Sequence, residues 1–179
     1  VGASGTGIQE VTTIIDRMDK GVTNALGTGG RDLSTEVGAI TMLDSIKALN
    51  HDPKVKVITV ISKPPAKEVE EKVLNVLRNI DKPVVTLFLG AKPTYTEENI
   101  YHAYTLDEAA QVSVQLANDE TPSFKPSVLD NISLTLSAQQ DGIKGYYSGG
   151  TLASEAAMLV KDTLGDASEG ETPEGYSYK

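Results

Sequence analysis

The 179-residue chain contains no cysteine and no tryptophan, and it has only two histidines. Without cysteine it can form no disulfide, no thiolate nucleophile and no zinc site built on sulfur. This composition fits a reducing compartment, and we expect a cytoplasmic protein. No apolar run approaches the roughly 20 residues that a membrane-spanning helix needs, so no membrane is expected as a partner.

Basic charge is also scarce, because 16 Lys and Arg residues stand against 25 Asp and Glu residues and give a net charge of -9. Nucleic-acid-binding proteins gather Lys and Arg on one face to neutralise phosphates. This chain has no dense basic cluster, so nucleic acid is not an expected partner. A small anionic substrate remains compatible, since backbone dipoles act locally whatever the net charge.

Apolar periodicity predicts alternating helices and strands. The expected helices cover 8–18, 37–49, 67–80, 106–116, 127–138 and 151–164, and the expected strands cover 22–26, 55–61, 84–89, 100–104 and 143–147. Gly21 is expected to cap the first helix.

This alternation indicates an α/β fold with a flavodoxin-like, doubly wound parallel sheet. We assign residues 1–118 to this domain, 119–126 to a linker and 127–164 to the start of a second, similar unit. The polar tail 165–179 is expected to be disordered in isolation. Val1-Gly2 reads as the end of a strand, which predicts an upstream segment outside this sequence.

One pattern occurs twice, because Gly5-Thr6-Gly7-Ile8-Gln9-Glu10 aligns with Gly150-Thr151-Leu152-Ala153-Ser154-Glu155 in Gly, Thr and Glu. Each copy opens a helix, whose unpaired N–H groups and dipole attract anions. Two ordinarily capped helices would show the same pattern. The candidates for a phosphate site are Ser4, Gly5, Thr6, Gly7, Ser148, Gly149, Gly150 and Thr151. Glu10 and Glu155 are possible crevice residues.

Further candidates lie where the strands end, because ligands of open α/β sheets bind there. Gly29, Gly30 and Arg31 follow one expected strand, and Lys63 follows the next. Lys63 could hold a phosphate or be an ordinary solvated lysine. Arg31 could line the same crevice or pair with Asp32.

Other chemistry has weaker support in the sequence. The glycine spacing matches neither a P-loop nor the dinucleotide fingerprint, which argues against a flavin or nicotinamide cofactor. His51 and His102 lack a partner pattern for metal or nucleophilic chemistry, so structural roles and no metal site are expected.

Five stretches resemble the succinyl-CoA synthetase α-subunit superfamily, and within it the FdrA family: GASGTGIQEV, GTGGRDL, VITVISKPP, KPVVTLFLGAKP and GYYSGGTLASEA. They occur in this order over nearly all of the chain before the tail. The resemblance implies a ligase-type domain. In the ligases two helices point their N-termini at one phosphate, and the helices starting at Thr6-Gly7 and at Thr151 would be that pair.

The chain departs from the ligases at their phosphohistidine loop. The ligases carry the histidine in a Gly-His-Ala-Gly-type loop, whereas this chain reads AKPTYTEENIYHAY, in which His102 lacks the glycine context. Lys63 stands near the place where the ligases set a Glu against that histidine. We therefore assign no catalytic residue and expect no phosphohistidine.

FdrA proteins are described as acyl-CoA synthetases by homology, and some belong to an oxamate carbamoyltransferase. The resemblance therefore implies an enzyme component that binds CoA or carbamoyl phosphate and is inactive without the rest of the protein. Its partners would be the remainder of an FdrA-like chain or further subunits of a homo- or hetero-oligomer. The alternative is a non-catalytic binding or assembly module that kept the ligase fold.

Overall fold

A parallel sheet lies at the centre of the computed structural model, which describes residues 1–92, 97–126 and 144–164. Its strands follow the order β1 (Ile58–Ser62), β2 (Val84–Phe88) and β3 (Ile100–His102). All five residues of β2 are buried. Such a continuous apolar strand is typical of a position with neighbours on both edges and helices on both faces.

Two short segments continue the sheet beyond β1. The segment 1–3 lies next to β1, and the segment 26–28 lies next to 1–3. Parallel bridges join Gly2 to Ile61 on one side and to Gly27 on the other. We number these five segments by their place in the sequence. Across the sheet they lie in the order second, first, third, fourth and fifth, which is the flavodoxin-like strand order. The expected doubly wound α/β fold is confirmed.

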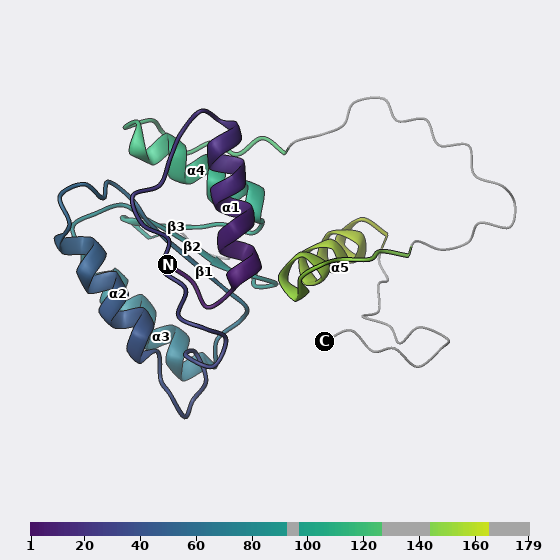
Figure 1. Ribbon diagram of the computed structural model, residues 1–179, viewed down its shortest axis with the longest axis horizontal. Coiled ribbons are helices and arrows are strands. Elements are labelled where there is room, and N and C mark those ends of the chain that lie inside the picture. The colour runs from purple at the N-terminus through teal and green to yellow at the C-terminus, as the bar shows by residue number, and fades with distance from the viewer. Residues whose placement is uncertain (93–96, 127–143, 165–179) are drawn as a thin grey trace, which may run out of the picture.

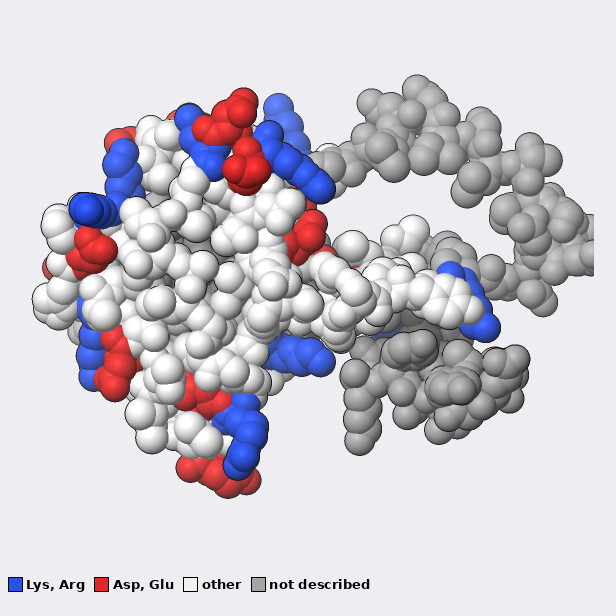
Figure 2. All heavy atoms as spheres, viewed as in Figure 1, with Lys and Arg blue, Asp and Glu red and all other residues white. Residues whose placement is uncertain are grey.

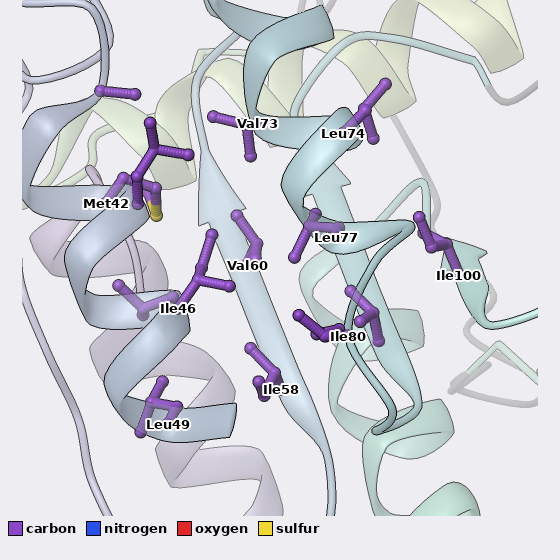
Figure 3. Packing of buried hydrophobic residues seen from close by; sticks show 14 of the residues in the cluster. Met42, Ile46, Leu49, Ile58, Val60, Val73, Leu74, Leu77, Ile80 and Ile100 are labelled. Carbon is purple, nitrogen blue, oxygen red and sulfur yellow. The ribbon is translucent and has the colours of Figure 1, made fainter. Parts of the chain in front are cut away.

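Helices cover both faces of the sheet, as Figure 1 shows. Helices α1 (Gly5–Arg17) and α4 (Leu106–Ala117) lie on one face, and α2 (Ile40–His51) and α3 (Lys67–Leu77) lie on the other. Each face has its own apolar core. The core beneath α2 and α3, seen in Figure 3, includes Met42, Ile46, Leu49, Ile58, Val60, Val73, Leu74 and Leu77.

The last described helix, α5 (Gly150–Leu164), begins beside the start of α1 (Figure 1). It follows a stretch, 127–143, that lies outside the described residues, as does the tail 165–179. The expected helix 127–138 and the expected disorder of the tail therefore stay predictions. None of the described helices has the length and apolar character needed to cross a membrane.

The first helix ends earlier than expected. Helix α1 stops at Arg17, and Asp19 takes the left-handed conformation with φ 56°. The amide of Lys20 then donates to the carbonyl of Ile15 at 3.2 Å, which closes the helix with a Schellman motif. Gly21 is therefore not the cap, because Asp19 adopts the conformation that was expected of a glycine.

Two expected strands are not formed. The stretch 22–26 makes no ladder, and only its last residue joins the sheet, where the carbonyl of Leu26 accepts a hydrogen bond of 2.9 Å from the amide of Gly2 beside the Gly27 bridge. Residues 144–147 form no strand either and lead directly into α5. The second helix begins at Ile40 rather than at 37, because Ala39 just before it has a positive φ of 64° that a helix does not permit.

Candidate functional site

The start of α1 is built tightly onto the end of β1. Ser4 caps the helix, and its Oγ accepts a hydrogen bond from the amide of Gly7 at 3.0 Å. A Cβ at Gly7 would lie 2.9 Å from the Ile61 side chain, so only glycine permits this approach. The amides of Gly5 and Thr6 have no acceptor within the helix, because they belong to its first turn.

The start of α5 meets the start of α1 within the same chain. Ser4 Oγ lies 2.6 Å from Thr151 Oγ1, and both residues are buried. Thr6 in turn packs against Gly149, where a Cβ would come within 2.4 Å of Thr6 Cγ2. The contact is reciprocal, because the residue before each helix touches the second residue of the other. The structure therefore brings together the two copies of the repeated sequence pattern.

Among the described helices, α1 and α5 differ from the other three because no carboxylate lies at their first turn. The N-terminus of α2 has the carboxylate of Asp32, that of α3 has Glu68 and Glu70, and that of α4 has Asp107 and Glu108. The first turns of α1 and α5 contain no acidic residue. Two positive dipole ends thus meet without a carboxylate of their own, an arrangement that favours binding of an external anion.

Lys and Arg side chains do not gather into one patch on the face shown in Figure 2. They are interspersed with Asp and Glu over the described part of that face. An anion at the junction of α1 and α5 would therefore be attracted by the local backbone amides and helix dipoles rather than by a basic surface.

A separate hollow of about 410 Å³ lies at the carboxyl end of β1. Its lining includes Gly30 and Lys63, together with Ala3, which precedes the Ser4 cap. The exposed side chain of Lys63 thus lies near the start of α1, on the side away from β2. Gly29 shapes the loop with a φ of 83°, which glycine adopts readily.

Asp32 is not paired with Arg31 but caps α2. Its two carboxylate oxygens accept hydrogen bonds from the amides of Thr41 at 3.0 Å and Met42 at 2.8 Å. The Asp32 side chain is buried at 4% exposure, whereas Arg31 is exposed. No local sequence pattern indicates this cap, because Asp32 stands eight residues before the first residue of α2.

Glu155 also has a role that was not expected. Its Oε1 accepts a hydrogen bond of 2.6 Å from the amide of Leu106, the first residue of α4. Burial raises the pKa of Glu155 above its ordinary value, the Leu106 amide opposes that rise, and the charges of Glu10 and Asp107 add to it. Glu155 therefore joins α5 to α4 through this hydrogen bond.

Both histidines lie close to oxygen atoms of the protein. His102 Nδ1 lies 2.7 Å from Thr86 Oγ1, and its Nε2 lies 3.4 Å from Glu97 Oε1. Burial lowers the pKa of His102, and Glu97 partly opposes this. His51 ends α2 on the surface, with Nδ1 2.7 Å from the carbonyl oxygen of Lys47. No three potential metal ligands gather within 1–92, 97–126 and 144–164.

Comparison with known proteins gives two findings. The family model of the CoA binding domain matches residues 1–90, from the start of the sheet to the end of β2. A protein of Escherichia coli (strain K12) named "Uncharacterized protein YahF" is 40% identical over 172 residues, which cover 93% of this chain. The chain spans only about a third of that relative, 33% of its length. With half of its residues matched by the model, the chain belongs to the CoA-binding domain family, within the succinyl-CoA synthetase α-like fold.

Proposed function

We propose that the chain is the phosphate-handling part of an acyl-CoA synthetase-like protein, and that one phosphate group binds between the starts of α1 and α5. The observation that carries the proposal is the 2.6 Å contact between Ser4 Oγ and Thr151 Oγ1. It places two helix N-termini, each with unpaired first-turn amides, at one point. The amides of Gly5 and Thr6, with their α5 counterparts, would bind the oxygens of the phosphate.

Electrostatics support this site. Each helix end carries a partial positive charge, and a bound anion contributes typically about 0.3–1 kcal/mol at an exposed helix N-terminus. The two ends repel each other when no anion is present. Because neither first turn supplies a carboxylate, a phosphate ester would relieve that repulsion from both sides.

The substrate that fits this proposal best is carbamoyl phosphate or a related acyl phosphate, as in an FdrA-type carbamoyl transfer. The bond between the carbamoyl carbon and the phosphate oxygen would break, the acceptor's nucleophilic atom would bond to that carbon, and the acceptor's proton would leave to solvent. The paired helix starts would stabilise the charge on the departing phosphate. His102, on β3, lies between Thr86 and Glu97 and takes no part in this proposed transfer.

The hollow lined by Ala3 and Lys63 would bind the second substrate, which is the acceptor or CoA. It opens next to the Ser4 cap, and Lys63 at its rim would attract an anionic group of the acceptor or of CoA. The remainder of a longer FdrA-like chain, or further subunits, would complete the site at which the acceptor binds.

A calorimetric titration with carbamoyl phosphate tests the proposal. Gly5→Val places a side chain in open space in front of the helix start, since nothing lies within 4 Å of a Cβ there. We expect it to weaken binding about tenfold, or 1.4 kcal/mol, and Lys63→Ala to weaken it less. Gly21→Val is the matched control, because its Cβ also meets open space but lies beyond the other end of α1.

The outcomes separate the candidate functions. Binding that Gly5→Val weakens and Gly21→Val leaves unchanged supports a phosphate site at the helix starts. Binding of CoA without carbamoyl phosphate would favour an acyl-CoA ligase. If neither compound binds, the chain is better described as a non-catalytic assembly module.

A further inference from the structure

Helix α5 contacts the sheet domain through polar side chains along its length. Thr151 meets Ser4, Glu155 binds the start of α4, and Asp162 binds residues beyond β2 and β3. The Asp162 carboxylate accepts hydrogen bonds from Lys92 Nζ at 2.8 Å and Tyr104 Oη at 2.6 Å. The docked position of α5 is thus defined by specific contacts as well as by apolar packing.

The contact of Glu155 is the one closest to the proposed anion site. Residues four apart lie one turn apart on the same side of a helix, so Glu155 follows directly below Thr151. Its target amide, Leu106, belongs to the first turn of α4 and has no acceptor within that helix. The Thr105 cap does not serve it, because Thr105 Oγ1 accepts from the amide of Glu108 at 3.0 Å.

The charges around Glu155 indicate that its carboxylate does not attract the anionic ligand. Glu10 of α1 and Asp107 of α4 have the same sign, and the carboxylate is partly buried. A negative charge one turn below an anion site would by itself weaken anion binding. What the carboxylate does supply is a fixed link between α5 and the amide of Leu106.

We propose that Glu155 is a positioning residue: by binding the Leu106 amide, it sets the depth and rotation at which α5 presents Thr151 to Ser4. This inference rests on the proposed function for its effect on ligand affinity, but not for its effect on docking. Glu98, an exposed carboxylate before β3 that is not among the candidate site residues, provides the control.

Two conservative variants separate positioning from charge. Glu155→Gln keeps the length and an acceptor oxygen but removes the charge, whereas Glu155→Asp keeps the charge and shortens the reach by one methylene. We expect Glu155→Asp to lower the affinity for inorganic phosphate at least fivefold, and Glu155→Gln to retain or raise it. Glu98→Asp should leave the affinity within twofold of the unchanged chain.

Docking is measured without any ligand. Because the chain has no cysteine, Ser4→Cys with Thr151→Cys gives a single pair whose disulfide forms only when the two helix starts meet. We expect the rate of disulfide formation to fall severalfold when Glu155→Asp is added and to be retained with Glu155→Gln. The Glu98→Asp control should not slow disulfide formation.

The two readouts fail in different ways. If phosphate does not bind to the unchanged chain, the proposed function is wrong, while the disulfide rates still decide the role of Glu155. The positioning role is overturned if Glu155→Asp docks as fast as the unchanged pair. It is also overturned if Glu155→Gln loses docking or affinity as far as Glu155→Asp does.

Discussion

At the scale of single residues, one buried and one half-buried polar side chain, Asp32 and His102, have roles that local sequence rules do not predict. Asp32 caps a helix from eight residues upstream, and His102 joins β3 to Thr86 of β2. Both satisfy partners that are distant in sequence or in another strand, so their roles became visible only with the fold.

Removing the Asp32 cap should destabilise the chain. Asp32→Ala deprives two first-turn amides of α2 of their acceptor in a buried setting, and we expect a loss of about 1–2 kcal/mol in the free energy of unfolding. Urea unfolding followed by circular dichroism measures it. Asp44→Ala, at an exposed position on the same helix, should stay within about 0.5 kcal/mol; equal losses for both variants would argue against the cap.

Burial of His102 predicts a dependence of stability on acid. Because its folded pKa lies below the ordinary 6.5, the unfolded chain takes up a proton before the folded chain does as the pH falls. The contribution of His102 to stability is therefore constant above that value and decreases as the pH falls from about 6.5 towards the folded pKa.

Unfolding midpoints between about pH 5 and pH 8 test this effect. His102→Gln should reduce the loss of stability on the acid side, whatever its effect at neutral pH. His51→Gln, on the exposed end of α2, should leave the dependence of the unfolding midpoint on pH unchanged. The prediction is contradicted if the unfolding midpoint changes with pH in the same way in the unchanged chain and in the His102 variant.

At the scale of elements, periodicity and composition predicted the described helices and the three strands of the sheet. The β-branched run before Ser62 and the continuous apolar run of β2 were strong signals, because burial on both faces demands them. The strand expected at 22–26 failed because pairing depends on the neighbouring segment rather than on the residues themselves. The end of α1 was misplaced because Asp19 adopts a conformation usually assigned to glycine.

Close approach of α1 and α5 depends on Gly149. A methyl group there would lie 2.4 Å from Thr6 Cγ2, so Gly149→Ala should push the two helix starts apart. We expect faster hydrogen exchange of α5 amides in this variant, and partial recovery when Thr6→Ala is added. Gly21→Ala, in open space, is the control, and unchanged exchange in Gly149→Ala would show that the contact is not close in solution.

At the scale of the whole molecule, the sequence predicted both candidate helix starts but not that they meet in one chain. The repeated pattern identified Ser4, Thr6, Gly149 and Thr151, since each copy has the composition of a helix N-terminus. Their contact depends on the docking of α5, which Glu155 and Asp162 stabilise through partners far away in the sequence. The family match to residues 1–90 agrees with the predicted fold. It includes α1 but not α5, so it covers only one of the two helix starts.

The most direct test of the account is an amide NMR titration with carbamoyl phosphate, with inorganic phosphate in parallel. If the two helix starts form one anion site, the amide signals of Gly5, Thr6, Gly150 and Thr151 shift together and give one dissociation constant. Shifts confined to one helix, or two different constants, would contradict the paired site, and no shift at either helix would remove it altogether.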